Sequence, residues 1–400
     1  MARAVLYTPH PNQRIIHNCV NDTDHKYYVI NIGRQFGKTL LGMNQMMHWA
    51  LNERQVKIAW VSPVYKQSKK VFEETYKAFA KRPEIYREVN KSSLIIEYVT
   101  GSTIQFFSAE RYDNIRGFTF DYLIIDEFAF VDERAWTEVL RATVLVRGKK
   151  VLLISTPRGK NHFYLLHQLD GINPQYKSFT MTSYDNPMIN PTEIDDAKLT
   201  LPDHVFRQEY LAQFIEGGAN IFKPQYKQSS GGNKFYGGVD LGRADDYSVL
   251  SIMNENGEQV FIDRWRHDSW TNISKKIADK INEYNALTYI EVNSIGDAIF
   301  EQVQNLCHNR ENVQPFVTTS KTKQDIIEGL AVATQGDEVY FTDVEWLKKE
   351  FEVFTFKYNA KSRSIKYGAP FGFHDDGVIA TALSYSSFKV LKSSGEYYVT

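Results

Sequence analysis

The sequence predicts a two-domain α/β protein, and three observations support this prediction. Short apolar runs alternate with longer helical patterns up to about residue 155, an order typical of an open sheet covered by helices. A segment at 216–234, rich in Gly, Ser, Asn, Gln and Lys, interrupts this pattern. After it, three consecutive strand patterns precede the next helix, so the order of elements changes. A length of 400 residues suits two or three domains of about 150 residues each.

The first half contains the runs expected of buried parallel strands, which are apolar on both faces because helices cover the sheet on both sides. Four strands are predicted, at 26–32, 56–61, 122–125 and 151–154. Helical patterns lie at 38–51, 66–80 and 132–142. Residues 94–107 are predicted to form an antiparallel hairpin that turns at Thr100-Gly101-Ser102. Together these elements predict an open α/β sheet.

The second half follows a different order. We predict a first domain at 1–215, a linker at 216–232 and a second domain at 233–400. The second domain begins with three strands, at 235–241, 247–253 and 259–265. Further elements follow as helix 271–285, strand 288–292, helix 296–308, strand 313–317, and helices near 321–334 and 375–388. Three meandering strands followed by alternating helices and strands is the order of a ribonuclease H-like sheet.

Composition limits the classes of partner and compartment. The chain has 47 Lys and Arg against 48 Asp and Glu, a net charge of −1, so a polyanionic partner would require locally gathered basic residues. Two cysteines, Cys19 and Cys307, lie far apart, which argues against a disulfide framework and fits a reducing, intracellular compartment. No apolar stretch has the length of a signal-peptide core or a membrane span, so we expect no membrane partner.

A candidate phosphate-binding loop follows the first strand. Its residues are Gly33, Arg34, Gln35, Phe36, Gly37, Lys38 and Thr39. In a P-loop, backbone N–H groups and the next helix N-terminus cradle phosphates, the lysine reaches the terminal phosphates and the hydroxyl binds magnesium. The first glycine comes one position later than in the usual GxxxxGK[ST] spacing, since Ile32 stands in its place. The alternative is a glycine turn that begins a helix with an exposed lysine.

Two acids end the strand that contains residues 122–125. Asp126 and Glu127 follow the apolar run directly, in the sequence DYLIIDE. A carboxylate at the carboxyl end of such a strand can hold magnesium through water, and the next can polarise an attacking water. We therefore assign Asp126 to the metal and Glu127 to catalysis. At another strand end, Ser155 and Thr156 would meet the terminal phosphate, unless this is an ordinary strand exit.

Acids also occur at unusual places in the second domain. Asp240 and Glu291 lie inside apolar strands, and Asp375 and Asp376 open the last helix. A carboxylate in an apolar strand is costly unless it is paired or bound to metal. In a ribonuclease H-like order the first and fourth strands are adjacent and the last helix crosses them, so these acids would converge. Two magnesium or manganese ions are the usual solution for phosphodiester cleavage. For each acid alone, a helix cap or solvated strand end is the alternative.

These motifs together resemble the large terminase subunit of tailed bacteriophages, over almost the whole chain. The marks of the resemblance, in order, are GRQFGKT (33–39), IRG (115–117) before DYLIIDE, STPRG (155–159), VDLG (239–242), IEVN (290–293) and HDDGVIATAL (374–383). Their order and spacing make the resemblance specific. It implies an N-terminal P-loop ATPase domain of the RecA (ASCE) kind and a C-terminal ribonuclease H-like nuclease domain.

The resemblance also implies roles that spacing does not show. Gln13 looks like the adenine-contacting glutamine, Arg34 matches the P-loop arginine, and Arg116 matches an arginine that reaches a neighbouring subunit's nucleotide. Such an arginine finger requires an oligomeric ring, a pentamer in this family; the alternative for Arg116 is a surface salt bridge. Ser155 and Thr156 belong to the family's coupling motif.

The implied cofactors are ATP and Mg²⁺, with Mn²⁺ as a second option at the nuclease site. The implied partners are double-stranded DNA, the small terminase subunit and the portal protein of the procapsid, in the host cell cytoplasm. Glu291 departs from the family, where many relatives carry Asp. The doubled Asp375 and Asp376 leave the third metal ligand open, and His374 either contributes or caps the helix.

DNA contacts would come from local basic clusters, for which a solvated protein face is the competing interpretation. The clusters are Lys66, Lys69 and Lys70; Arg147, Lys149 and Lys150; Lys321 and Lys323; and Lys361, Arg363 and Lys366.

The sequence thus predicts an ATP-driven DNA translocase fused to a two-metal endonuclease. One alternative is a nucleic-acid-dependent helicase or repair ATPase with an appended nuclease, which would need a second RecA-like domain after the linker. A non-catalytic nucleotide-binding scaffold is the other, and it would leave Lys38, Glu127, Asp240 and Glu291 without a chemical reason.

Overall fold

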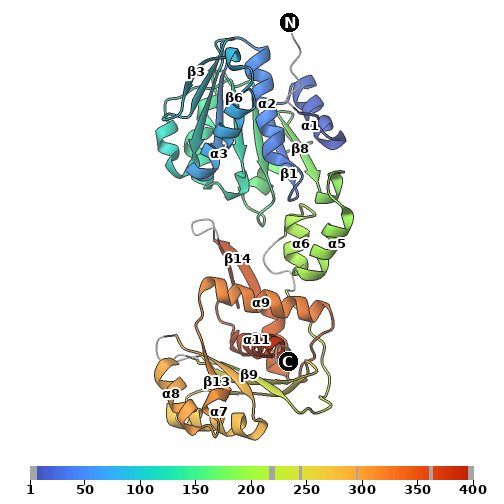
Figure 1. Cartoon of the computed structure of the whole chain (residues 1–400), viewed down its shortest axis with the longest axis vertical. Coiled ribbons are helices and arrows are strands. Elements are labelled where there is room, and N and C mark those ends of the chain that lie inside the picture. The colour runs from blue at the N-terminus through green and yellow to red at the C-terminus, as the bar shows by residue number, and fades with distance from the viewer. Residues whose placement is uncertain (1–6, 216–220, 243–245, 294–295, 360–363, 395–400) are drawn as a thin grey trace. The chain divides into compact units, whose positions relative to one another are not determined.

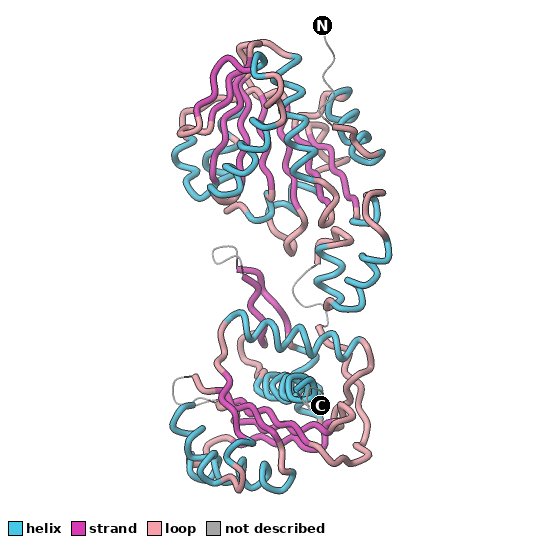
Figure 2. The backbone as a smooth tube through the Cα atoms, in the orientation of Figure 1, coloured by secondary structure: helices cyan, strands magenta, loops and turns pink. Residues whose placement is uncertain are grey.

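The structure is a computed structural model that describes residues 7–215, 221–242, 246–293, 296–359 and 364–394. It divides into two compact units (Figures 1 and 2). The first consists mainly of Met1–Ala197 and Val205–Glu216, and the second mainly of Gly217–Asn359 and Ser364–Thr400.

The first unit is an eight-stranded sheet with the strand order β3-β4-β5-β2-β6-β7-β1-β8. The strands are β1 (Tyr27–Ile32), β2 (Lys57–Ser62), β3 (Tyr86–Asn90), β4 (Ile95–Tyr98), β5 (Thr103–Ser108), β6 (Tyr122–Asp126), β7 (Lys150–Ser155) and β8 (Tyr176–Met181). Six neighbouring strands from β5 to β8 run parallel, and β3 and β4 add an antiparallel edge. The carboxyl ends of β1, β6 and β7 therefore meet at one edge of the sheet, where open α/β sheets bind ligands.

Helices cover this sheet on both faces. They are α1 (Pro11–Asp22), α2 (Lys38–Asn52), α3 (Tyr65–Lys77) and α4 (His162–His167), and α5 (Pro191–Thr200) and α6 (Asp203–Glu209) follow along the chain. Short 3₁₀ segments lie at Pro83–Ile85, Ala109–Ile115, Phe128–Phe130, Ala142–Val144 and Ser183–Asp185. Alternate side chains of β1 enter two cores: Tyr28 and Ile30 pack with α1, α2 and α3, while Val29 packs in the opposite layer.

The second unit is a five-stranded sheet with the order β11-β10-β9-β12-β13. Its strands are β9 (Phe235–Asp240), β10 (Ser248–Asn254), β11 (Gln259–Trp265), β12 (Leu287–Glu291) and β13 (Val313–Phe316). The first three are antiparallel, whereas β12 runs parallel to β9 and to β13. This order places the first and fourth strands side by side, as the ribonuclease H-like prediction required, and the predicted fold class is confirmed.

The helices of the second unit are α7 (Trp270–Tyr284), α8 (Gly296–Leu306), α9 (Ser320–Gln335), α10 (Glu345–Val353) and α11 (Asp376–Ser394), with a 3₁₀ turn at Arg310–Asn312 and a separate hairpin of β14 (Thr355–Asn359) and β15 (Ser364–Gly368). Helix α11 packs on β9 and β10, and α7 and α8 cover the opposite face (Figure 2). Gly238 of β9 allows α11 to pack closely on the strand, because a Cβ at this position would overlap the backbone of Ala380 and Ser384.

Several predicted elements differ from the structure. The helix predicted at 132–142 is a π-helical segment, Ala135–Leu140, followed by the 3₁₀ turn. The sequence did not predict the helices α1, α4, α5, α6 and α10 or the strands β3, β8, β14 and β15, most of which carry the mixed polar pattern of edge strands or short helices.

The predicted linker lies partly outside the described residues, at 216–220. The described part, 221–232, contains no helix or strand but packs within the second unit. Phe222 is buried against Phe351, and Lys227 pairs with Glu258 at 2.9 Å. Among the described residues, no helix combines the length and apolar character needed to cross a bilayer.

Candidate nucleotide and metal sites

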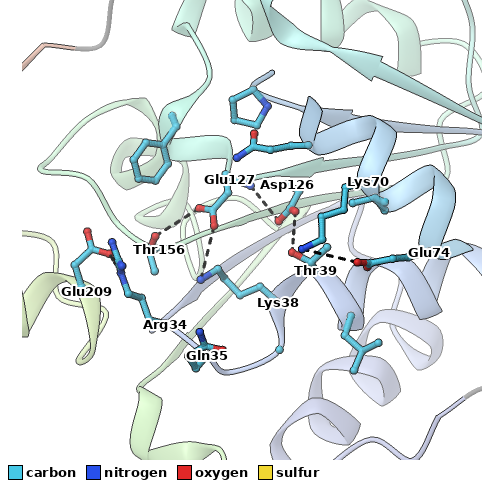
Figure 3. Close-up of a pocket in the computed structure, with 16 residues that line it drawn as sticks. Arg34, Gln35, Lys38, Thr39, Lys70, Glu74, Asp126, Glu127, Thr156 and Glu209 are labelled. Atoms are coloured by element: carbon cyan, nitrogen blue, oxygen red, sulfur yellow. Dashed lines mark hydrogen bonds and ion pairs between the residues drawn. The ribbon is translucent and has the colours of Figure 1, made fainter. Parts of the chain in front are cut away.

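The predicted phosphate-binding loop connects β1 to α2. Gly37 begins the helix in the left-handed conformation, with φ +96°, which a residue with a side chain rarely adopts. Residues Arg34, Gln35, Gly37, Lys38 and Thr39 line a cavity of about 690 Å³. The cavity also receives Asp126, Glu127 and Thr156 from the ends of β6 and β7 (Figure 3). The structure therefore brings together most of the residues that the sequence assigned to phosphate and magnesium.

Thr39 and Asp126 form the magnesium side of this cavity. The Thr39 hydroxyl donates to Asp126 Oδ2 at 3.0 Å. Asp126 is 6% exposed, and burial together with the adjacent Glu127 carboxylate raises the pKa of Asp126 to about 7. A cation at this carboxylate would offset both causes, so Thr39 and Asp126 fit the oxygen ligands that Mg²⁺ prefers.

Glu127 faces the cavity from a strained backbone position, with φ +52°. Its Oε1 lies 3.9 Å from Lys38 Nζ, and its Oε2 accepts hydrogen bonds from Ser155 at 3.3 Å and Thr156 at 3.5 Å. These contacts hold the carboxylate toward the place where the lysine would meet a terminal phosphate (Figure 3). Ser155 also accepts from the Ala129 N–H at 3.2 Å, which ties the end of β7 to the turn after Glu127.

Arg34 pairs with an acid that sequence analysis missed. Its Nε donates to Glu209 Oε2 at 2.6 Å, and Arg158 Nη1 lies 3.4 Å from the other oxygen of the same carboxylate. Glu209 is 4% exposed and belongs to α6, 175 positions after Arg34. Local sequence carries no sign of this pair, because it depends on where α6 packs.

Three of the predicted nucleotide-binding residues face away from the cavity. Phe36 is fully buried in the core, with its ring edge-on to His10 at 4.7 Å between centroids. Gly33 donates its N–H to Met181 O at 2.9 Å, and a Cβ there would meet Tyr210 O. Gln13 is 3% exposed and donates to Gly37 O at 3.3 Å. These residues belong to or contact the loop on its side away from the cavity, and Gln13 is not among the described residues that line the cavity.

Arg116 is exposed and lies outside its own subunit's cavity. It pairs with Asp113 at 2.8 Å and with Glu138 at 3.5 Å. Both interactions are on the surface, where such pairs contribute little to stability. The structure thus contains the surface salt bridge named as the alternative, and also leaves the guanidinium accessible to a neighbouring molecule.

The second candidate site lies where β9 and β12 end beneath the start of α11. Asp240 and Glu291 are the last residues of these adjacent parallel strands, directly after the paired Val239 and Ile290. Burial, followed by the charges of Glu291, Asp376 and Asp375, raises the pKa of Asp240 well above its ordinary value. The structure therefore brings together all four acids that the sequence singled out.

Asp376 and Asp375 differ in their contacts. Asp376 is 8% exposed and accepts from the Tyr247 N–H at 3.2 Å, while burial raises the pKa of Asp376 to about 6. Asp375 pairs with Lys323 at 3.4 Å and lies against Gly368 of β15. Asp376 is thus the more buried of the two acids, and Asp375 is partly neutralised by a lysine.

His374 and a further acid complete the cluster. His374 Nδ1 lies 3.5 Å from Asp376 and 3.6 Å from Asp246, and the three side chains offer ligand atoms within 4.8 Å of one another. This buried nitrogen has no hydrogen-bond partner among the described atoms. Sequence analysis missed Asp246, which follows Asp240 by six positions and carries no apolar context. Buried carboxylates with raised pKa values, next to a nitrogen that has no hydrogen-bond partner among the described atoms, fit divalent cations.

The basic clusters proposed for DNA contact are mostly committed to other partners. The ion pairs join Lys70 to Glu74, Arg147 to Asp121, Lys149 to Glu53 and Lys323 to Asp375. The Lys150 ammonium donates to carbonyls at the end of α1. Lys70, Arg147 and Lys149 are exposed despite these pairs, and Lys66, Lys69, Lys321 and Lys366 are exposed too. Lys361 and Arg363 lie outside the described residues.

Comparison with known proteins shows which family this chain is similar to. A family model described as terminase large subunit, T4-like virus type, N-terminal matches residues 29–226. The terminase large subunit of Thermus virus P23-45 is 26% identical over 436 residues, which covers 96% of this chain and 88% of that protein. The terminase large subunit of Escherichia phage T5 is 29% identical over 263 residues, covering 61% of this chain and 60% of that one.

A solved structure shows the same fold. The large terminase of a thermophilic bacteriophage is 14% identical, with a TM-score of 0.54, and the match covers 96% of this chain and 100% of that one. One unit contains the P-loop site and the other contains the carboxylate cluster, and the relatives named above are terminase large subunits. The chain therefore belongs to the terminase large subunit family of tailed bacteriophages.

Proposed function

We propose that the chain hydrolyses ATP to move double-stranded DNA into a procapsid and cuts concatemeric DNA by two-metal hydrolysis. The observation that supports this most is the separation of two acidic sites. Glu127 lies beside the P-loop lysine in one unit, and Asp240, Glu291 and Asp376 converge in the other. Each site has the groups for one of the two reactions.

In the ATPase site, Glu127 would accept the proton of the attacking water. The hydroxyls of Ser155 and Thr156 orient its carboxylate, and Lys38 would stabilise the charge that develops on the transferred phosphoryl group. Magnesium held by Thr39 and Asp126 would neutralise phosphate charge. The hydroxyls of Ser155 and Thr156 contact Glu127 directly, so loss of the terminal phosphate would change the surroundings of these hydroxyls. This change would couple ATP hydrolysis to movement of the DNA.

Nuclease chemistry would use the carboxylates of the second unit. Asp240, Glu291 and Asp376, with Asp375 or Asp246 beside them, would hold Mg²⁺ or Mn²⁺. These cations would supply Lewis-acid activation of the scissile phosphodiester. His374 would orient Asp246 and Asp376 through the nitrogen that lies between them.

The assembly would be a ring, a pentamer by family resemblance, docked on the portal and supplied with DNA by the small terminase subunit, in the host cytoplasm. Arg116 would reach the nucleotide of the neighbouring subunit, Arg34 would act at its own P-loop, and Gln13 would support adenine binding through the loop that it contacts. The ATPase domain would comprise residues 1–215, the linker 216–232 and the nuclease domain 233–400. A helicase needs a second RecA-like domain, whereas the second unit has the sheet order β11-β10-β9-β12-β13.

The test uses two full-length variants and two assays. Lys38→Ala should lower DNA-stimulated ATP hydrolysis at least about 100-fold and leave Mn²⁺-dependent nicking of a plasmid unchanged. Asp240→Ala should abolish Mn²⁺-dependent nicking of the plasmid and leave DNA-stimulated ATP hydrolysis unchanged. Wild-type hydrolysis in Lys38→Ala would contradict the ATPase assignment, and wild-type nicking in Asp240→Ala would contradict the nuclease assignment. Lys77→Ala, an exposed lysine at the end of α3, is the control for both assays.

A further inference from the structure

Arg264 lies on the same face of the second sheet as the metal-site acids. It is on β11, opposite Val249 of β10, and Val249 is opposite Asp240 of β9. Residues directly opposite each other on neighbouring strands project to the same face. With strands about 4.8 Å apart, the backbones of Arg264 and Asp240 are separated by roughly 10 Å. Arg264 is therefore close to the carboxylates but belongs to none of the roles described above.

The guanidinium of Arg264 has three partners. Its Cζ lies 4.2 Å from the ring centroid of Tyr247 and 4.4 Å from that of Trp346. Its Nη1 lies 3.5 Å from Glu350 Oε1, and the Glu350 side chain is 6% exposed. An arginine can stack on aromatic rings and present its edge to a carboxylate at the same time, which a lysine cannot do.

Each partner contacts a part of the backbone that carries a metal-site residue. Tyr247 follows Asp246 in the chain, donates its N–H to Asp376 at 3.2 Å, and lies edge-on to the His374 ring at 5.0 Å. Glu350 accepts from the Gly377 N–H at 2.8 Å, directly after Asp376.

Trp346 packs against the same turn of α11. A Cβ at Gly377 would lie 2.5 Å from its ring, so the indole fills the space beside the first turn of the helix. One guanidinium thus joins the loop that carries Asp246 to the helix start that carries Asp376. These two segments are 130 positions apart in the chain.

We propose that Arg264 is a positioning residue of the nuclease metal site, acting through Tyr247 and Glu350 on the placement of Asp246 and Asp376. The inference rests on the proposed nuclease function. Partners behind the ligands of a metal site orient those ligands, and their loss typically weakens metal affinity about 10- to 100-fold.

The experiment measures Mn²⁺ binding to the full-length protein by isothermal titration calorimetry, without nucleotide. The heat that is lost in Asp240→Ala defines binding at the nuclease site. Arg264→Met and Arg264→Lys should both weaken this binding roughly tenfold, and the Mn²⁺ concentration for half-maximal plasmid nicking should rise by the same factor. The lysine variant separates the planar, stacked geometry from the charge alone.

The control is Arg310→Met, an exposed arginine that contacts Asn305 near the opposite edge of the sheet; its Mn²⁺ affinity should equal that of wild type. If Arg264→Met does not fold, Glu350→Gln gives the answer, because its amide oxygen can still accept from Gly377 while the ion pair is lost. Glu350→Gln should weaken Mn²⁺ binding, as Arg264→Met does.

Unchanged Mn²⁺ affinity in folded Arg264→Met or in Glu350→Gln, even with a lower melting temperature, would overturn the inference and leave a purely structural ion pair. Absence of Asp240-dependent Mn²⁺ binding in the wild type would instead overturn the nuclease assignment itself. The two failures are therefore distinguishable.

Discussion

Asp126 titrates near neutral pH, which makes its protonation measurable. Burial and Glu127 raise its folded pKa to about 7, against about 3.9 in an unfolded chain. Between these values the folded protein binds more protons than the unfolded one. The contribution of Asp126 to stability is therefore present below about pH 4 and is lost as pH rises through about 7.

Asp126→Asn should consequently raise the melting temperature of the nucleotide-free protein at pH 8, by roughly 2–4 °C for each kcal/mol of relief, with a smaller difference at pH 5. The same variant should gain less stability from Mg²⁺ and ATP than the wild type, because the metal-side carboxylate is gone. Thermal unfolding at both pH values checks the prediction. An equal effect at pH 5 and pH 8 would contradict it.

Glu127 offers a second test at the scale of one residue. Glu127→Gln keeps the side-chain shape and the hydrogen bonds from Ser155 and Thr156 but removes the proton acceptor. We expect kcat for ATP hydrolysis to fall at least about 100-fold with nucleotide binding retained. Glu74→Gln is the matched control, because Glu74 lines the same cavity and pairs with Lys70. Steady-state kinetics of ATP hydrolysis by both variants test this prediction. A kcat near the wild-type value in Glu127→Gln would show that Glu127 is not the catalytic base.

At the scale of elements, the approach of α11 to β9 decides where Asp376 lies. Gly238 allows this approach, because the helix backbone at Ala380 and Ser384 occupies the space of a side chain. For Gly329, in α9, Tyr385 at 3.9 Å is the only neighbour of a hypothetical Cβ within the part of the chain that the structure describes. The same substitution at these two glycines therefore separates packing from helix propensity.

Gly238→Ala should destabilise the second unit by about 1–3 kcal/mol through overpacking and should also weaken Mn²⁺ binding, since α11 carries Asp376. Gly329→Ala should be neutral or stabilising by up to about 1 kcal/mol. Urea unfolding and Mn²⁺ titration measure both properties. An Mn²⁺ affinity in Gly238→Ala equal to that of wild type would show that the acids do not depend on this contact.

At the scale of the whole molecule, the ring proposal makes a prediction about mixed subunits. A Lys38→Ala subunit has lost its own site but keeps Arg116, and an Arg116→Ala subunit has the opposite defect. If Arg116 acts on a neighbour, mixing the two inactive proteins under assembly conditions should restore part of the DNA-stimulated ATP hydrolysis. Hydrolysis that stays at the level of the separate variants would favour the surface salt bridge with Asp113.

The local sequence pattern was enough to predict some of the residues of both sites. Apolar runs that end in polar residues located Lys38, Asp126 and Asp240, because a buried strand and a loop at its end differ sharply in composition. The order of elements also predicted that β9 and β12 are neighbours, which the parallel register between them confirms.

Contacts between distant segments were not predictable in this way. Glu209 reaches Arg34 from 175 positions away, and Asp246 lies beside His374 and Asp376, which come much later in the chain. No local period or spacing encodes such pairs, since they exist only once the helices have packed.

The sequence by itself determined the two-domain α/β class, the phosphate-binding loop and the acids that converge in the second unit, because each depends on local pattern or on the order of elements. Only the tertiary structure decided that Gln13 and Phe36 lie behind the loop, that Asp376 is more buried than Asp375, and that Arg264 joins two distant segments. These facts depend on which faces meet, and packing of side chains from distant segments sets that.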